Sequence, residues 1–272
     1  MASVNRGCKA VTFSGGVNAV VENVGITRGP VFQTKSLQGS HEFKNWLEKN
    51  FPRLAEIAQS TSSHLILLKQ KISIIGKNVF VRFSFDTSDA MGMNMATYAT
   101  DKIAAYIRQE TKIECLSLAG NFDLDKKPSY LNFIEGRGKK VWAEAVISPQ
   151  IVRDVLKTTP ERIHQLAVTK CYLGSIMSGS LGFNAHFANI IAAIFLATGQ
   201  DGAHIVEGSL GITTTDVSDG SLYMSIYLPD LPVGTIGGGT GLPAQSEALK
   251  LLGVLAGMDG KNSMKIKKFL KI

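Results

Sequence analysis

Hydrophobic and polar positions alternate along one stretch in the first half of the chain. Residues 79–85 place valine or phenylalanine at every second position, and residues 71–75 form a second run rich in isoleucine. Alternation with a period of two is typical of a half-buried β-strand. Gly76 and Lys77 separate the two runs, so we expect a β-hairpin closed by a tight type II′ turn.

Helical spacing flanks this hairpin on both sides. Apolar residues recur every three or four positions across residues 42–59 and again across residues 90–110, and each pattern predicts a helix. A short strand is expected at residues 116–119. This section therefore reads as a compact α+β unit inserted into a longer chain.

The second half carries start and stop signals for further elements. Ser148 and Thr159 each precede a proline, which is typical of an N-cap followed by the first turn of a helix. We therefore predict an α+β (mixed α/β) fold with helices from Pro149 and Pro160, a helix at 185–198 that ends at Gly199, a strand at 222–228, and a helix from Pro243 onward.

Composition places the chain among globular proteins. Its 272 residues allow one large domain or two ordinary ones, at roughly 150 residues per domain. Hydrophobic residues make up 44% and charged residues 19%, which argues against disorder. No apolar run approaches the roughly 18 residues of a membrane span, and the N-terminal residues lack an apolar signal core. We expect a cytoplasmic protein.

The net charge of +7 is concentrated at one end. Five lysines lie in residues 261–272, and without them the net charge falls from +7 to +2. We expect no nucleic-acid partner, because the rest of the chain is nearly neutral and has no periodic aromatic platform. Residues 264–272 read as the start of an amphipathic helix or as a membrane-surface anchor.

Neither cysteines nor histidines form a metal-binding pattern. Cys8, Cys115 and Cys171 are scattered, without a CxxC spacing, and the five histidines show no HxxxH pair. Reduced, buried thiols fit this pattern better than a disulfide framework or a zinc site. We expect no metal centre.

Two glycine-containing segments are candidates for binding an anion. In SFDTSDAMGMNM, residues 84–95, Asp89 is expected to cap a helix that starts near Ala90, with Gly92 in the first turn. Uncapped N–H groups and the helix dipole favour an anion there, although methionines also suit core packing. VGTIGGGTG, residues 233–241, permits close backbone approach but lacks the context of a dinucleotide fingerprint.

Charged residues in GNFDLDKKP, residues 120–128, suggest catalysis. Asp125 is expected to hold Lys126, and a held ammonium stabilises a developing oxyanion; the other interpretation is a solvated pair of lysines. Asp201 is either a turn aspartate or a carboxylate that tunes a nearby lysine. His186 and Asn189 are either a satisfied polar pair or substrate donors.

These motifs together resemble one family. VNRGCKAV with GITRGPV, DAMGMNM, GNFDLDKKP, EGRGKK, LKTT, FNAHFANI with ATGQD, and VGTIGGGT occur in the order and spacing of hydroxymethylglutaryl-CoA reductases, nearest to the eukaryotic and archaeal branch. The resemblance implies NADPH-dependent reduction of hydroxymethylglutaryl-CoA (HMG-CoA) to mevalonate and CoA, by a homodimer or larger assembly whose sites lie between protomers. It implies a large HMG-CoA-binding domain, residues 1–29 and 119–272, and a small ferredoxin-like NADPH-binding domain, residues 30–118.

The resemblance also implies roles for individual residues. Lys126 would polarise the thioester carbonyl and Asp201 would belong to the charged network around it. The implied contacts of the hydroxymethylglutaryl group are Arg28, Asp125, Lys127, Lys170, His186 and Asn189; those of CoA are Ser3, Asn5, Arg6 and Lys157; those of NADPH are Asp89, Met91, Gly92, Met93, Asn94, Gly237, Gly238 and Gly239.

Some positions depart from the family pattern. The family's EGCLVAS-like segment carries a glutamate proton donor and its C-terminal tail a histidine; we expect this chain, which begins at Met1 and stops at Ile272, to lack both. Ala119 replaces a frequent serine. Ser63 and His64 stand in place of an arginine-aromatic pair near the cofactor's 2′-phosphate, which weakens the expected preference for NADPH over NADH.

Three functional interpretations therefore remain open from the sequence. In the first, the chain is a truncated form of a working reductase. In the second, it is a non-enzymatic protein that binds CoA and a nucleotide, and in the third, it is a structural partner that completes a mixed dimer with a full-length relative. General acids typically contribute about 10²- to 10⁴-fold each, so loss of both donors would impair turnover.

Overall fold

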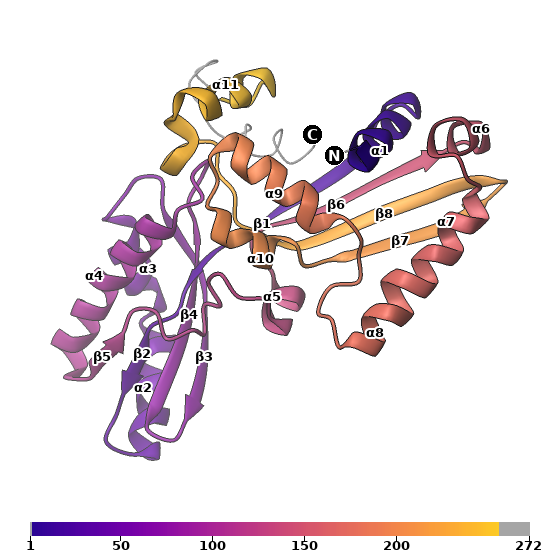
Figure 1. Cartoon of the computed structure of the whole chain (residues 1–272). Helices are drawn as coiled ribbons and strands as arrows, with labels where there is room; N and C mark the ends of the chain where they lie inside the picture. The colour runs from indigo at the N-terminus through magenta and orange to yellow at the C-terminus, as the bar shows by residue number, and fades with distance from the viewer. Residues whose placement is uncertain (1, 256–272) are drawn as a thin grey trace. The chain divides into compact units, whose positions relative to one another are not determined.

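The computed structural model describes residues 2–255 and divides the chain into two compact units (Figure 1). Residues 23–125 form the inserted unit, and the chain before residue 23 and after residue 125 forms the discontinuous unit. Each boundary lies outside the predicted one, at 29/30 and 118/119. The inserted unit is larger than predicted because it includes the second half of β1 (Asn18–Arg28) and the loop after β5 (Glu114–Ser117).

The inserted unit has the topology of a ferredoxin-like fold. Its elements follow the order β2 (Val31–Gln33), α2 (Leu37–Lys49) and α3 (Phe51–Gln59), β3 (Ile66–Ile75), β4 (Asn78–Asp86), α4 (Met93–Thr111) and β5. The strands are antiparallel in the order β5-β2-β4-β3, and the end of β1 also pairs with β4. This is the split βαβ arrangement that the family resemblance implied.

The predicted hairpin is present and supplies much of the core. Ile75 pairs with Asn78 across the two-residue turn, where Gly76 has φ 58°, the left-handed region that glycine enters easily. The core-facing residues of β4, Val79, Val81, Phe83 and Phe85, are fully buried, together with Leu47, Leu54, Ile103 and Ile107 of the helices. The helices therefore pack one apolar face onto the sheet.

Residues 42–59 form two helices rather than one. The first, α2, begins earlier than predicted, at Leu37, where the Ser36 hydroxyl accepts a hydrogen bond from the Gly39 N–H. The break falls at Asn50, two residues before Pro52. A proline has no N–H to donate and its ring clashes with the preceding turn, so the helix restarts instead of continuing.

The helix that follows the hairpin begins three residues later than predicted. Gly92, at φ 87°, is the N-cap of α4, and as a glycine it offers no side chain to cap this end. The prediction that Asp89 caps the helix is wrong: its side chain is buried, and the Thr87 hydroxyl instead closes the turn by donating to the Ala90 carbonyl at 2.8 Å. The left-handed conformation of Gly92 permits this compact turn.

In the discontinuous unit, β6, β8 and β7 lie side by side in that order and pair antiparallel. Its strands are β6 (Arg137–Ile147), β7 (Ile212–Ser218) and β8 (Ser221–Leu231), with Arg137 paired to Asp230 at one end. Phe187, Ile191 and Phe195 of one helix are buried with Leu228 and Leu231 of β8. The predicted strand at 222–228 thus forms the middle of this sheet.

Short helical segments surround that sheet. Both proline-initiated helices are present, because Ser148 and Thr159 accept N-cap hydrogen bonds as predicted, and Gly199 ends the predicted helix at φ 71°. The segments are α1 (Ala2–Phe13), α5 (Tyr130–Glu135), α6 (Pro149–Ile151), η1 (Val152–Leu156), α7 (Pro160–Leu166), η2 (Ala167–Gly174), α8 (Ser175–Ser178), α9 (Phe187–Thr198), η3 (Gly202–His204), α10 (Ile205–Gly208), η4 (Gly238–Gly241) and α11 (Pro243–Leu251).

The expectation of reduced, buried thiols is met only in part. All three cysteines are free thiols and Cys171 is buried, but Cys8 is exposed because it lies on the outer face of α1, where Ala10 is the buried residue. Among the helices of residues 2–255, none combines the length and apolar character that crossing a bilayer requires. The basic segment 264–272 lies outside the described residues.

Gly92→Ala should destabilise the inserted unit. An added Cβ would lie 2.3 Å from Cγ2 of Thr87, on a backbone at φ 87° that alanine rarely adopts. We expect a loss of more than about 1 kcal/mol in the free energy of unfolding, measured by urea denaturation of the full chain.

The matched control is Gly7→Ala, in the middle of α1, where an added Cβ meets nothing within 4 Å. This change should stabilise the chain by about 0.5–1 kcal/mol, because alanine is the better helix former. Equal effects of the two substitutions would contradict the described turn at Gly92.

Candidate active site

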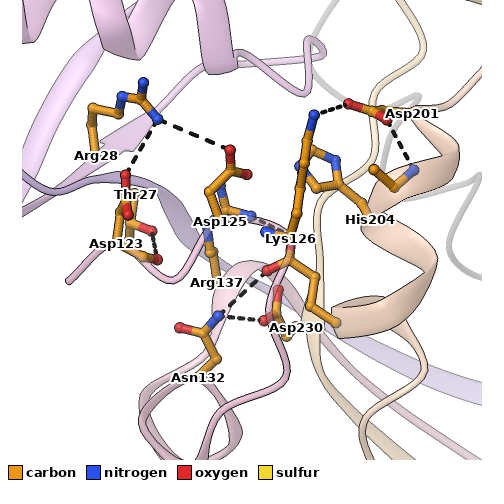
Figure 2. A network of polar contacts seen from close by, with 12 residues as sticks. Thr27, Arg28, Asp123, Asp125, Lys126, Asn132, Arg137, Asp201, His204 and Asp230 are labelled. Carbon is orange, nitrogen blue, oxygen red and sulfur yellow. Dashed lines mark hydrogen bonds and ion pairs between the residues drawn. The ribbon is translucent and has the colours of Figure 1, made fainter. Parts of the chain in front are cut away.

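Lys126 stands at the start of the second part of the discontinuous unit, in a strained backbone conformation. Its φ is 60°, which is uncommon for a residue with a side chain. The ammonium Nζ lies 2.8 Å from Oδ2 of Asp201, and the two side chains are 42% and 37% exposed. The lysine is therefore held by a partner yet remains open to a ligand (Figure 2).

Asp201 both caps a turn and contacts the lysine. Its Oδ1 accepts the Ala203 N–H at 3.0 Å and so caps η3, while Oδ2 binds the lysine. Partial burial raises the pKa of Asp201, but the hydrogen bonds from Lys126 and from the Ala203 N–H outweigh it and hold the pKa below its ordinary value. Asp201 thus presents a fixed negative charge to the ammonium.

A buried polar cluster lies beneath this pair, and the sequence analysis missed it. Glu207 of α10 is fully buried and its Oε1 lies 2.7 Å from Nη1 of Arg137 and 3.5 Å from Nε2 of His204. Asn132 of α5 donates to Oδ2 of Asp230 at 2.7 Å and reaches Oε2 of Glu207 at 3.4 Å. Burial is the main cause that raises the pKa of Glu207; Arg137 opposes the rise and Asp230 adds to it.

The cluster touches the catalytic candidate directly. The backbone N–H of Lys126 donates to Oε1 of Glu207 at 3.1 Å. The spacing of His204 and Glu207, three positions apart and shortly after Asp201, is the signal that could have located the cluster. Such spacing places two side chains on one face of a helix, but it gives no reason to expect that this face is buried.

Arg28, in the inserted unit, is held by two aspartates. Its Nη1 lies 3.3 Å from Oδ2 of Asp123 and 4.0 Å from Oδ2 of Asp125. The structure therefore brings together the predicted substrate residues Arg28 and Asp125, and adds the buried Asp123, which the sequence analysis did not single out. The Thr27 hydroxyl fixes the loop by donating to the Asp123 carbonyl at 2.8 Å (Figure 2).

Other predicted substrate residues lie in the discontinuous unit. Lys170, within the π-helical segment η2, lines a cavity of about 540 Å³ whose wall also includes Pro128, Asn184 and several serines. Such π-helical turns are rare in proteins as a whole, but those that occur are often found at functional sites. Nδ2 of Asn189 lies 3.2 Å from Nδ1 of His186, so these two side chains do meet, with His186 as the N-cap of α9.

The residues expected to bind CoA share one region of the discontinuous unit. Ser3, Asn5 and Arg6 are exposed on α1, which packs against η1. Lys157 ends η1 in a left-handed conformation, with φ 60°, and is exposed. Sequence positions about 150 residues apart are thus brought onto neighbouring elements.

Lys127, another predicted substrate residue, is exposed beside Lys126.

The predicted cofactor residues of the inserted unit surround the start of α4. Met91 and Met93 pack partly against the core, whereas Asn94 is exposed. The N-cap of α4 is a glycine, and the first N–H groups of a helix form an end suited to an anion. Core packing therefore accounts for the two methionines, and the anion site at the backbone stays a prediction.

The glycine-rich segment lies in the other unit and has a partly structural explanation. A Cβ on Gly237 or Gly238 would meet nothing within 4 Å, so these two present open backbone. A Cβ on Gly239 would lie 2.8 Å from the carbonyl oxygen of Gly199, where η4 meets the end of α9. Close backbone packing therefore explains Gly239. The expected absence of a metal centre stays a prediction.

Comparison with known proteins decides the family. The family model described as hydroxymethylglutaryl-coenzyme A reductase matches residues 1–271. The chain belongs to the hydroxymethylglutaryl-coenzyme A reductase family. This membership confirms the resemblance inferred from the motifs.

Archaeal relatives in this family are similar over nearly the whole chain. The 3-hydroxy-3-methylglutaryl-coenzyme A reductase of Aeropyrum pernix is 50% identical over 98% of the chain, and that of Methanocaldococcus jannaschii 49% identical over 93%. The matched part is 64% of either relative, so the chain spans less than two thirds of their length.

Solved structures support the fold. A 3-hydroxy-3-methylglutaryl-coenzyme A reductase of Streptococcus pneumoniae matches with a TM-score of 0.71 at 18% identity, over 99% of this chain and 73% of that one. A second structure, of the class II enzyme from the same organism bound to NADPH in open conformations, matches with a TM-score of 0.67 at 17% identity, with the same coverage. The mixed α+β prediction is confirmed.

Asp201→Asn should lower the free energy of unfolding of the chain by an amount that depends on pH. The folded-state pKa of Asp201 lies below its ordinary value of 3.8, so its ionised form contributes stability above that value, and this stability is lost as the pH falls through the folded-state pKa. Near neutrality we expect a loss of less than about 1 kcal/mol, because water screens this partly exposed pair.

Urea unfolding of both proteins across acidic and neutral pH measures this difference. It should shrink toward zero below the ordinary carboxyl pKa, since asparagine retains the cap on Ala203. A difference that grows as the pH falls would contradict the lowered pKa of Asp201.

Proposed function

We propose that the chain reduces HMG-CoA to mevalonate and CoA with NADPH, and that Lys126 is the residue that polarises the reacting carbonyl. Support comes from family membership across residues 1–271 and from the contact of Lys126 with Asp201 at 2.8 Å. The observation that carries the proposal is this exposed, held ammonium. The relatives that carry the reductase name are longer than the chain, so activity is a proposal.

The chemistry follows from the charge that develops on the substrate. Addition of a first hydride to the thioester places negative charge on the carbonyl oxygen, and protonation then gives a hemithioacetal. After CoA thiol leaves, a second hydride adds to the aldehyde and places negative charge on the same oxygen, which takes up a proton to give the alcohol. Lys126 would stabilise that oxygen in both steps, an effect worth about 10²- to 10³-fold for one such donor. Asp201 would keep the ammonium in place between steps.

The same proposal assigns recognition of the hydroxymethylglutaryl group to charged and polar side chains. The hydroxymethylglutaryl carboxylate suits a cationic side chain, and Arg28, Lys127 and Lys170 are the candidates, because fixed cations bind carboxylates with charge-assisted hydrogen bonds. His186 and Asn189 would add hydrogen bonds, and Asp125 would orient Arg28. CoA would lie along Ser3, Asn5, Arg6 and Lys157, the exposed residues of α1 and the end of η1.

NADPH would supply the hydride when bound. The start of α4 fits a pyrophosphate, because the dipole of a 19-residue helix ends there behind a glycine N-cap that carries no side chain. Gly92 admits close approach, with Met91, Met93, Asn94 and Asp89 around it. The open backbone of Gly237 and Gly238, before Gly239, would form a second surface. NADPH preference over NADH stays a prediction.

Assembly and location belong to the proposal as well. Self-association with sites between protomers, as a homodimer or larger assembly, is implied by the family resemblance. A cytoplasmic location and the absence of a nucleic-acid partner stay predictions made from the sequence.

Lys126→Ala should abolish reduction and leave CoA binding largely intact. We expect NADPH oxidation that depends on HMG-CoA to fall at least about 10²-fold, followed by the loss of NADPH absorbance. Calorimetric titration with CoA should give a dissociation constant close to that of the unchanged protein, because Lys126 would act on the carbonyl and not on CoA.

The matched control is Lys44→Ala on α2, a partly exposed lysine paired with Glu48. It should leave turnover unchanged. Turnover that persists in Lys126→Ala would refute the role of this lysine. Binding of CoA and NADPH by the unchanged protein without any turnover would favour the alternative, a non-enzymatic binding protein, and activity restored only by a full-length relative would favour the mixed dimer.

A further inference from the structure

We propose that Glu207 is a positioning residue for Lys126: it fixes the lysine backbone from below while Asp201 fixes the ammonium from above. The inference deepens the proposed function and rests on it for its catalytic consequence. Its structural part, the hold on the lysine backbone, stands without any assumed activity.

One short segment provides both contacts. Asp201 and Glu207 are six residues apart, at the two ends of the run that forms η3 and α10. Asp201 binds Nζ of Lys126 at 2.8 Å, and Glu207 accepts its backbone N–H at 3.1 Å. Lys126 is therefore held at both ends by the same piece of chain, which limits both the origin of its side chain and the place of its charge.

The backbone contact has a physical purpose. Lys126 has φ 60°, and for a lysine this left-handed backbone conformation has a higher energy than the extended or right-handed helical conformation. Such a conformation persists where its surroundings determine it. A buried carboxylate oxygen that accepts the N–H supplies this determination, and the side chain then leaves the backbone in the direction of Asp201.

Glu207 itself is fixed by buried partners from several elements. Arg137 at the start of β6 is 0% exposed and lies 2.7 Å from the same oxygen that accepts the lysine N–H. His204 approaches that oxygen at 3.5 Å and Asn132 the other oxygen at 3.4 Å. Donors from a strand and two helical segments thus hold one carboxyl group, and any lateral shift of it would break several contacts.

The cluster is costly unless it positions something. A buried ion pair is often no more stable than apolar residues of similar volume, so stability alone is a weak explanation for one. Here the buried carboxyl group accepts a hydrogen bond from the backbone N–H of the proposed catalytic lysine. The contact links the burial of Glu207 and Arg137 to the geometry of the site.

Glu207→Leu and Glu207→Gln test the proposal as a pair. Glutamine keeps an oxygen that accepts the Lys126 N–H, whereas leucine removes it. We expect kcat per folded protein to fall about 10²-fold in Glu207→Leu, the scale of a misplaced catalytic group, with KM for HMG-CoA nearly unchanged, and Glu207→Gln to recover most of kcat. The exposed Glu247→Leu on α11 is the matched control and should keep full activity.

A purely structural role gives a different result. Both variants would then lose folded protein to similar extents, and kcat per folded protein would stay at the level of the unchanged chain. That outcome would overturn the proposal.

Hydrogen exchange tests the same contact without enzymatic activity. With lysines labelled by ¹⁵N, the Lys126 amide of the unchanged full chain should exchange slowly with solvent, although its side chain is exposed, because the N–H donates to a buried oxygen. Fast exchange in the unchanged chain would overturn the proposal whether or not the variants fold. Slow exchange together with absent turnover would retain the hold on the lysine and reject the proposed reductase activity.

Discussion

The charge of one ammonium group, and the fixed place of that charge, is the constraint around which the discontinuous unit is arranged. Lys126 is partly exposed, so water competes for its charge, and an exposed ion pair by itself contributes little stability. The surrounding chain compensates by limiting motion: Asp201 is tied by its own helix cap, and the lysine backbone is tied to a buried carboxyl group. Precise placement, more than the strength of the pair, is what this arrangement supplies.

Sequence patterns located the local elements well, because each signal acts within a few residues. The hairpin at Gly76 and the caps at Ser148 and Thr159 depend only on neighbouring backbone, and each is present. The helix start at Gly92 was misplaced since Asp89 looks like a cap, whereas packing buries it. Periodicity gave no prediction for α1 or β6, and Pro52 divided a pattern that periodicity alone had joined.

The candidate site was predictable to the extent that motifs carry it. Lys126 with Asp201, and Arg28 with Asp125, are far apart in sequence, and family resemblance rather than spacing pointed to them; the structure brings the members of each pair together. The buried partners Asn132, Arg137 and Glu207 were missed, because charged residues are almost never fully buried unless paired, and pairing over 70 residues of chain leaves no local pattern. Tertiary contacts, not composition, identify such residues.

The central claim is that the Lys126 ammonium polarises the substrate carbonyl. Isotope-edited infrared spectroscopy of HMG-CoA labelled with ¹³C at the thioester carbonyl, bound in the absence of NADPH, measures this most directly. The account predicts that the carbonyl stretch moves to lower frequency on binding and that Lys126→Ala removes the shift while CoA binding remains. A shift that is absent in the unchanged protein with substrate bound, or that persists in the variant, would contradict it.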